Sequence, residues 1–237
     1  MAKAFTGLVF LMAAGGLFSE TGFPADTFPA APLALKITFL GHATFMITWG
    51  NTVIHVDPVS QYADYSKLPK ADIVLVTHEH FDHLDPDAVK AIRKADTEVV
   101  LTKNCMAKVP GASVMKNGES RTVRGIGVEA IPAYNLSKTF HPKGIGNGYL
   151  LTLGSRRLYV AGDTENTPEM KGLKDIDIAF LPMNLPYTMT PEMVADAALA
   201  FRPKILYPYH FGETDTAKLA ALLKDIPDIE VRIRPMK

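Results

Sequence analysis

Short runs of apolar, β-branched and aromatic residues dominate the chain from residue 35 onward, and turn-forming residues separate them. Three such runs open this part of the chain, at Lys36 to Leu40, Ala43 to Thr48 and Thr52 to Val56. Their composition and length are typical of β-strands. Gly50-Asn51, between the last two runs, suits a tight hairpin. The pattern therefore predicts a group of consecutive strands at the start of the folded part.

The pattern then changes to strands that alternate with helices. Ile73 to Val76 is apolar at every position, as expected of a strand that is covered on both faces. Asp85-Pro86-Asp87 predicts the start of a helix that continues to about Ala95, because aspartate caps helices and proline suits their first turn. Glu98 to Thr102 returns to strand composition.

The second half of the chain repeats this sequence of elements. Strands are predicted first and helices follow, with Gly154-Ser155 as a turn between two strands. The predicted strands are Val128 to Ile131, Tyr149 to Leu153, Leu158 to Ala161, Asp177 to Leu181, Lys204 to Pro208 and Glu230 to Ile233, and the predicted helices are Thr190 to Phe201 and Thr216 to Lys224. We predict an α/β fold of two mixed sheets packed face to face with helices outside, a four-layer αββα sandwich.

Residues 1–34 have a different composition and are predicted to be a leader, followed by one domain over residues 35–237. Lys3 precedes an uncharged, largely apolar run, Ala4 to Phe18, which is short for a membrane span and resembles the core of a signal peptide. Glu20 to Leu33 is rich in Pro, Ala and Thr and predicts a linker. If the leader is cleaved, the protein is periplasmic or secreted and keeps no membrane anchor; otherwise it is cytoplasmic. An N-terminal helix or an uncleaved anchor is the alternative.

Composition limits the classes of partner and the kinds of cysteine-based site that the chain can have. Lysine plus arginine equals aspartate plus glutamate at 25 each, so the net charge is zero with histidine neutral. This balance argues against nucleic acid and anionic lipid as partners and favours a small-molecule substrate. Cys105 is the one cysteine, which excludes an intrachain disulfide and a multi-cysteine metal cluster. The sequence does not determine the oligomeric state.

The heptapeptide Thr77 to His83 is the strongest candidate for a functional site. It places His78, His80, Asp82 and His83 directly after the apolar run at residues 73–76. Imidazole and carboxylate bind divalent cations such as zinc, and α/β sheets place their chemistry at strand ends.

Other metal-binding residue types also follow predicted strands. His42 lies between two early strands, Asp163 follows the strand at residues 158–161, and His210 follows the strand at residues 204–208. Asn135 and His141 lie together in the segment after the strand at residues 128–131. Each residue alone is weak support for a site, but their shared position at strand ends favours one joint centre.

These motifs resemble the metallo-β-lactamase superfamily. The heptapeptide matches its His-x-His-x-Asp-His signature, and Gly41-His42-Ala43-Thr44-Phe45, Ala161-Gly162-Asp163-Thr164 and Tyr209-His210 are similar to further elements of its small metal-dependent hydrolases. That branch is similar to the phospholipase D that hydrolyses N-acylphosphatidylethanolamine and to the lactonase of ascorbate utilisation. The resemblance covers about residues 35–237.

The resemblance implies a binuclear metal centre, with zinc expected and manganese or iron as alternatives. A carboxylate with two oxygens is suited to bridge two ions. The implied ligands are His78 and His80 with a third histidine for the first ion, Asp82, His83 and His210 for the second ion, and Asp163 as the bridge.

The third histidine departs from the family pattern. The family usually has a histidine a few residues after a Pro-Ala pair, and Asn135 holds that place here. His141 lies six residues later. We favour His141 as the ligand, because neutral imidazole binds zinc well and asparagine binds it poorly. Asn135, or a first site with no third ligand, is the alternative.

Several residues are predicted to act around the ligands. His42 is predicted to orient a ligand or to contact substrate, with a turn histidine as the alternative. Tyr187 is predicted to lie in a loop that reaches the site, with a helix-capping loop as the alternative. Asp57 is a candidate partner of a ligand. Glu79 and Phe81 alternate with the ligands and are predicted to be structural.

The predicted function is that of a binuclear metal-dependent hydrolase. A hydroxide that bridges the two metals would attack an ester, lactone, amide or phosphodiester, and Asp82 or metal-bound water would supply the proton for the leaving group. Di-iron redox chemistry is disfavoured because that branch needs an acidic ligand where His80 stands, and a nuclease is disfavoured by chain length and charge. A metal-binding protein of the same fold without turnover is the alternative.

Overall fold

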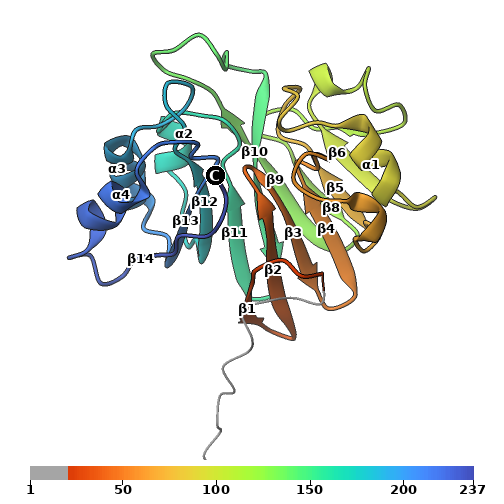
Figure 1. Cartoon of the computed structure of the whole chain (residues 1–237), viewed down its shortest axis with the longest axis horizontal. Helices are drawn as coiled ribbons and strands as arrows, with labels where there is room; N and C mark the ends of the chain where they lie inside the picture. The colour runs from red at the N-terminus through yellow and green to blue at the C-terminus, as the bar shows by residue number, and fades with distance from the viewer. Residues whose placement is uncertain (1–20) are drawn as a thin grey trace, which may run out of the picture.

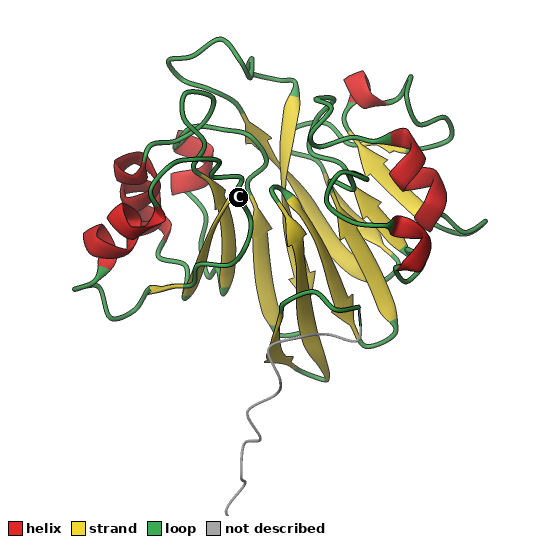
Figure 2. Cartoon of the chain, viewed as in Figure 1, coloured by secondary structure: helices red, strands yellow, loops and turns green. Residues whose placement is uncertain are grey.

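The structure, a computed structural model, describes residues 21–237 and consists of two seven-stranded sheets with helices on their outer faces (Figures 1 and 2). The predicted signal-peptide core lies outside the described residues. The helix α1 (Pro86–Ile92) covers the first sheet, and α2 (Pro168–Lys171), α3 (Pro191–Phe201) and α4 (Thr216–Leu223) cover the second. The predicted four-layer αββα sandwich is confirmed.

The first sheet has its seven strands side by side in chain order. β1 to β4 pair antiparallel, and β4 to β7 pair parallel. The hairpin predicted at Gly50-Asn51 is confirmed, since Trp49 pairs with Thr52 across it. The strands are β1 (Ala25–Ala30), β2 (Leu33–Gly41), β3 (Thr44–Trp49), β4 (Thr52–Val56), β5 (Ile73–Leu75), β6 (Glu98–Leu101) and β7 (Ser113–Val114).

The second sheet repeats the same plan. Its first strands pair antiparallel, from β8 to β11, and its last strands pair parallel, from β11 to β14. The strands are β8 (Ser120–Val123), β9 (Ile126–Ala133), β10 (Gly146–Leu153), β11 (Arg156–Val160), β12 (Ile178–Pro182), β13 (Ile205–Tyr209) and β14 (Glu230–Val231). Two 3₁₀ helices, η1 (Tyr65–Lys67) and η2 (Lys103–Cys105), lie in loops of the first half.

Capping residues explain where the helices begin. The helices α1, α2 and α3 each start with a proline that follows a polar cap, at Asp85, Thr167 and Thr190. Each cap side chain accepts a hydrogen bond from a backbone N–H of the first turn, which would otherwise have no partner. None of the helices between residues 21 and 237 has the length and apolar character that spanning a membrane requires.

The core between the sheets consists of aromatic and aliphatic side chains from both. Phe45 of β3 stacks on Phe180 of β12 with ring centroids 4.2 Å apart, and Phe180 also stacks on Tyr207 of β13. Two further apolar clusters join each sheet to its helices. The three clusters fix the two sheets against each other and hold their strand ends at a common edge.

The folded domain starts earlier than predicted. Ala25–Ala30 were predicted to be linker, but they form β1 and pair with β2 from Ala25 opposite Thr38 to Ala30 opposite Leu33. The indole N–H of Trp49 donates to the carbonyl oxygen of Ala30 at 3.1 Å. A proline-containing strand is tolerated here because β1 lies at the edge of the sheet, where Pro29 needs no ladder partner on its open side. The predicted boundary at residue 35 therefore falls inside β2.

Candidate metal centre

The histidine-rich loop after β5 is fixed by Asp57, at the end of β4. One carboxylate oxygen of Asp57 accepts the backbone N–H of Thr77 at 2.7 Å, and the other accepts the Thr77 hydroxyl at 2.7 Å. The same carboxylate accepts the Nδ1 proton of His83 at 2.8 Å. Asp57 is fully buried, so it holds both ends of the loop from within the protein. It was predicted to be a partner of a ligand, and these contacts give it that position.

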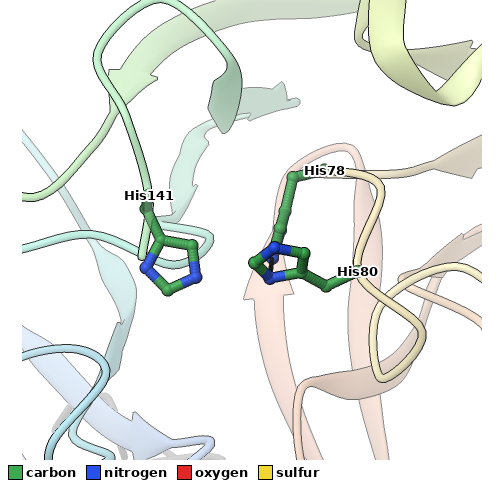
Figure 3. Close-up of side chains that lie close together, drawn as sticks. All are labelled: His78, His80 and His141. Carbon is green, nitrogen blue, oxygen red and sulfur yellow. Dashed lines mark hydrogen bonds between the residues drawn. The ribbon is translucent and has the colours of Figure 1, made fainter. Parts of the chain in front are cut away.

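Three histidines gather on one side of the centre: His78, His80 and His141 (Figure 3). One ring nitrogen from each lies within 4.8 Å of the corresponding nitrogens of the other two. Nε2 of His78 is 3.1 Å from Nδ1 of His80, and His141 faces both rings from the loop between β9 and β10. Three imidazole nitrogens that converge in this way match the donor set of a zinc site.

The structure brings His141, and not Asn135, into this group. Nδ1 of His141 donates to Oδ1 of Asn135 at 2.8 Å, while the side-chain amide of Asn135 donates to the carbonyl oxygen of Tyr187 at 2.8 Å. Because Nδ1 carries the proton, Nε2 of His141 is free to act as a ligand, and it lies 3.2 Å from Asp163. Asn135 therefore orients the histidine that replaces it.

A buried carboxylate, Glu165, holds the loop that carries His141. Its Oε2 accepts the backbone N–H groups of Leu136 at 2.6 Å and Ser137 at 2.8 Å, and Oε1 accepts the Ser137 hydroxyl at 2.9 Å. The ammonium of Lys138 lies 3.4 Å from Oε1. The sequence analysis missed Glu165. The available signal was a second acid two residues after Asp163.

A second group joins His42, Asp82 and His210. Nε2 of His42 and Nε2 of His210 each lie 3.3 Å from Oδ2 of Asp82. The backbone N–H of His210 donates to the carbonyl oxygen of His42 at 3.1 Å, so the two residues are joined through backbone as well. His42 was predicted to lie outside the ligand set. Its ring nitrogen occupies a ligand-like position beside Asp82.

Asp163 lies between the two groups. Its Oδ2 is 3.2 Å from Nε2 of His141 in the first group and 3.7 Å from Nε2 of His210 in the second, and its Oδ1 is 3.4 Å from Nε2 of His83. Gly162 allows this approach, because a Cβ at that position would lie 2.8 Å from the Asn147 carbonyl oxygen. Its φ of +66° is also one that glycine adopts without strain. Asp163 therefore has the position of a bridging carboxylate.

This centre has two buried polar atoms that a cation would satisfy. Among residues 21–237, Nε2 of His83 and Oδ1 of Asp163 are buried and have no hydrogen-bond partner. A buried polar atom without a partner is costly. Because Nδ1 of His83 donates to Asp57, Nε2 is the ring nitrogen that faces Asp163. A divalent cation would satisfy both, so the donor set fits a metal.

The charge balance of the centre also favours cations. Burial lowers the pKa of His78 well below its usual value, which keeps that imidazole neutral. Burial acts to raise the pKa of Asp82, but hydrogen bonds from His210 and His42 outweigh it and leave the pKa lowered. Burial also acts against ionisation of Asp163, but His210 and His83 hold its pKa well below the usual value. Burial likewise opposes the charge on His83, yet Asp163 and Asp57 raise its pKa well above the usual value. Without a metal the His83 ring therefore carries a second proton, which a bound cation would displace.

Comparison with known proteins identifies the family. The family model of the beta-lactamase superfamily domain matches residues 36–210. The chain belongs to the metallo-β-lactamase superfamily. A metal-dependent hydrolase of Pelotomaculum thermopropionicum is 30% identical over 221 residues, which cover 84% of this chain and 96% of that protein. A metal-dependent hydrolase of Koribacter versatilis is 33% identical over 204 residues, which cover 75% and 84%.

Solved structures agree with this membership. A crystal structure of a Parabacteroides distasonis protein described as a metal-dependent hydrolase aligns with a TM-score of 0.88 and 51% identity, over 91% of this chain and 100% of that one. A metallo hydrolase of Ignicoccus hospitalis is 24% identical and shares the fold, with a TM-score of 0.73 over 85% of this chain and 95% of that one.

In this member of the superfamily, three residues of the candidate metal centre have a strained backbone. His42, Asp57 and His210 have φ values of 53°, 43° and 47°, a left-handed conformation that non-glycine residues rarely adopt. Such strain persists where the surrounding structure over-determines it, as it does at functional sites. The hydrogen bonds of Asp57 and the backbone link between His42 and His210 provide that constraint.

The centre opens into a pocket of about 560 Å³. Tyr187 lines it, in agreement with the prediction that its loop reaches the site. Phe81 was predicted to be structural, but its side chain is 79% exposed and lines the same pocket. Glu79, also predicted to be structural, lines the pocket as well, and Asn104 donates to its carboxylate at 3.1 Å.

Proposed function

We propose that this metal-dependent hydrolase binds two divalent cations side by side. The first would be held by His78, His80 and His141, and the second by Asp82, His83 and His210, with Asp163 between them. His42 lies as close to Asp82 as His210 does and is an additional candidate for the second site. The observation that carries the proposal is a pair of buried atoms without a hydrogen-bond partner, Nε2 of His83 and Oδ1 of Asp163, which lie 3.4 Å apart within the centre.

The donor chemistry favours zinc, since most donors are imidazole nitrogens and the others are carboxylates. Manganese and iron are the alternatives. When bound, the two cations would activate water and polarise the scissile bond as Lewis acids. This is the chemistry of hydrolysis of an ester, a lactone, an amide or a phosphodiester.

The protein residues position the donors and handle protons. Asp57 fixes the proton of His83 on Nδ1, and Asn135 does the same for His141, so both rings turn Nε2 to the centre. Asp82 is the more exposed of the two central acids, with 24% of its side chain accessible against 4% for Asp163. Asp82 is therefore the residue that we propose to pass a proton to the leaving group.

The proposal is tested by metal analysis together with a substrate panel. Purified protein should contain close to two equivalents of divalent metal. A chelator should abolish turnover of at least one ester, lactone, amide or phosphodiester, and added metal should restore it. Protein without stoichiometric metal would contradict the site assignment. Stoichiometric metal with no turnover would favour the alternative, a metal-binding protein of the same fold.

A further inference from the structure

Large apolar side chains surround the mouth of the metal centre. Phe81 is 79% exposed, Phe140 44% and Tyr187 45%, and all three line the pocket. Leu136 and Leu185, on the same two loops as Phe140 and Tyr187, are also exposed. These five side chains make up half of the ten large apolar residues that are exposed between residues 21 and 237. Three of the ten therefore line this pocket and two more lie in the loops that carry Phe140 and Tyr187, which is typical of a binding surface.

The three aromatic residues reach the pocket from different parts of the sandwich. Phe81 lies in the loop after β5 of the first sheet, whereas Phe140 and Tyr187 lie in loops of the second sheet. The rings of Phe140 and Tyr187 meet edge to face, with centroids 5.0 Å apart. That contact fixes one apolar wall, and Phe81 lines the same pocket from the other sheet.

The apolar mouth and the metal centre are one continuous space. The pocket that these rings line is also lined by His80, Asp82, His141, Asp163 and His210. A substrate whose scissile bond lies at the metal centre would therefore have an adjoining group against the aromatic rings. Its volume, about 560 Å³, lies in the range of pockets that hold small organic ligands.

The charges around the pocket argue against a polyanionic substrate. Lys108 is the one lysine or arginine among the residues that line it, and its ammonium donates to the Glu79 carbonyl oxygen at 2.7 Å. The other charged side chains there, apart from histidines, are Glu79, Asp82 and Asp163. A nucleotide chain or a polyphosphate would lack cationic partners beyond the centre itself.

We propose that the substrate is an uncharged or singly charged acyl compound, an ester, lactone or amide, whose acyl chain or ring lies against Phe81, Phe140 and Tyr187. This inference rests on the proposed function. In the reaction, water adds to the acyl carbon, the bond from that carbon to oxygen or nitrogen breaks, and the leaving group takes up a proton. The products are a carboxylic acid with an apolar group and an alcohol or amine, or a single hydroxy acid from a lactone.

Binding of two hydroxamates to metal-loaded protein tests this inference without requiring turnover. Acetohydroxamate and octanohydroxamate share the metal-binding group and differ in six methylene groups. Octanohydroxamate should bind at least about tenfold more tightly in calorimetric titration, because each buried methylene favours binding. The difference should fall severalfold in Phe81→Ala, Phe140→Ala and Tyr187→Ala.

Leu222→Ala is the matched control, because Leu222 is 44% exposed on α4 and does not line the pocket. It should keep the full difference between the two hydroxamates. Melting temperatures check that each variant is folded, and Phe81, the most exposed of the three, is expected to tolerate replacement best. Equal affinity for the two hydroxamates, or an undiminished difference in all three aromatic variants, would overturn the inference.

The two proposals fail in distinguishable ways. If the protein holds metal and cleaves short esters but shows no preference for the longer hydroxamate, the inference about the mouth is wrong and the proposed function stands. If the protein takes up no metal, both proposals are wrong.

Discussion

Asn135 accepts the Nδ1 proton of His141 at 2.8 Å and thereby turns the opposite ring nitrogen toward His78 and His80. A second bond, from the backbone N–H of Asn135 to the carbonyl oxygen of His141 at 2.8 Å, closes the loop between them. The chain thus brings a histidine to the candidate metal centre from six residues beyond Asn135, and Asn135 supports that histidine.

Replacing Asn135 tests that support. Asn135→Ala should weaken metal binding at the first site by about 10- to 100-fold, because a histidine ligand without its outer hydrogen bond is less well oriented and less basic. Asn135→Asp keeps an acceptor for the Nδ1 proton and should bind metal far better than the alanine variant. Titration against a chromophoric chelator would measure both. Equal affinities in the wild type and Asn135→Ala would contradict the role.

Glu165 should also affect metal binding by His78, His80 and His141, although it is not one of these ligands. Glu165→Gln retains one acceptor oxygen for three donors of Leu136 and Ser137, so the loop that carries His141 should loosen. We expect weaker binding of the first metal and unchanged binding of the second. Glu192→Gln, on α3 and paired with Lys218, is the matched control and should change neither. Equal weakening of both metals in Glu165→Gln would indicate a general loss of structure instead.

Asp57 should contribute to stability even without metal. Asp57→Asn leaves one acceptor for donors from Thr77 and His83 that are fully buried, and it brings an amide N–H against one of them. We expect the free energy of unfolding to fall by about 2–3 kcal/mol, the usual effect of losing a hydrogen bond to a buried charged group. Urea unfolding in the presence of a chelator would measure it. A loss below about 0.5 kcal/mol would contradict the anchoring role.

His55 should make the stability of the metal-free protein depend on pH. Burial lowers its pKa from 6.5 to about 4, against a smaller opposite effect of its bond to the Pro69 carbonyl oxygen. In the unfolded chain the imidazole takes up a proton near pH 6.5, so the unfolded state binds more protons between pH 6.5 and pH 4. The contribution of His55 to the free energy of unfolding is complete above pH 6.5. It is lost as the pH falls toward 4, and the total loss is about 3 kcal/mol.

The variant His55→Gln separates the contribution of His55 to this pH dependence from that of other titrating groups. His55→Gln can still donate to the Pro69 carbonyl oxygen but does not titrate. Its free energy of unfolding, measured with urea and a chelator, should fall less steeply than that of the wild type between pH 6.5 and pH 4.5. Parallel pH profiles for the two proteins would show that His55 has no such role.

Much of the fold could be predicted from the sequence because its strands are apolar and its helices carry clear caps. The strand at residues 73–76 and the cap at Asp85 are examples, and both lie where expected. β1 was missed because Pro29 and its neighbouring alanines carry little strand preference; the strand forms because β2 offers a free edge. Local composition cannot reveal that kind of tertiary support.

The residues of the site also divide into those that the sequence predicts and those that it does not. His78, His80, Asp82 and His83 are close in sequence, so their motif predicted a common centre. Glu165 was missed because its partners are mostly backbone N–H groups 28 and 29 residues earlier in the chain, which no residue pattern records. Phe81 was misjudged because alternation with the ligands predicts direction along a strand, whereas this segment is a loop that turns the ring into the pocket.

The central claim is a pair of adjacent metal sites, and anomalous diffraction at the zinc edge from zinc-soaked crystals tests it most directly. The account predicts two peaks, one within bonding distance of His78, His80 and His141 and one within bonding distance of Asp82, His83 and His210, with Asp163 between them. A single peak, no peak, or a first peak bound by Asn135 with His141 turned away would contradict it.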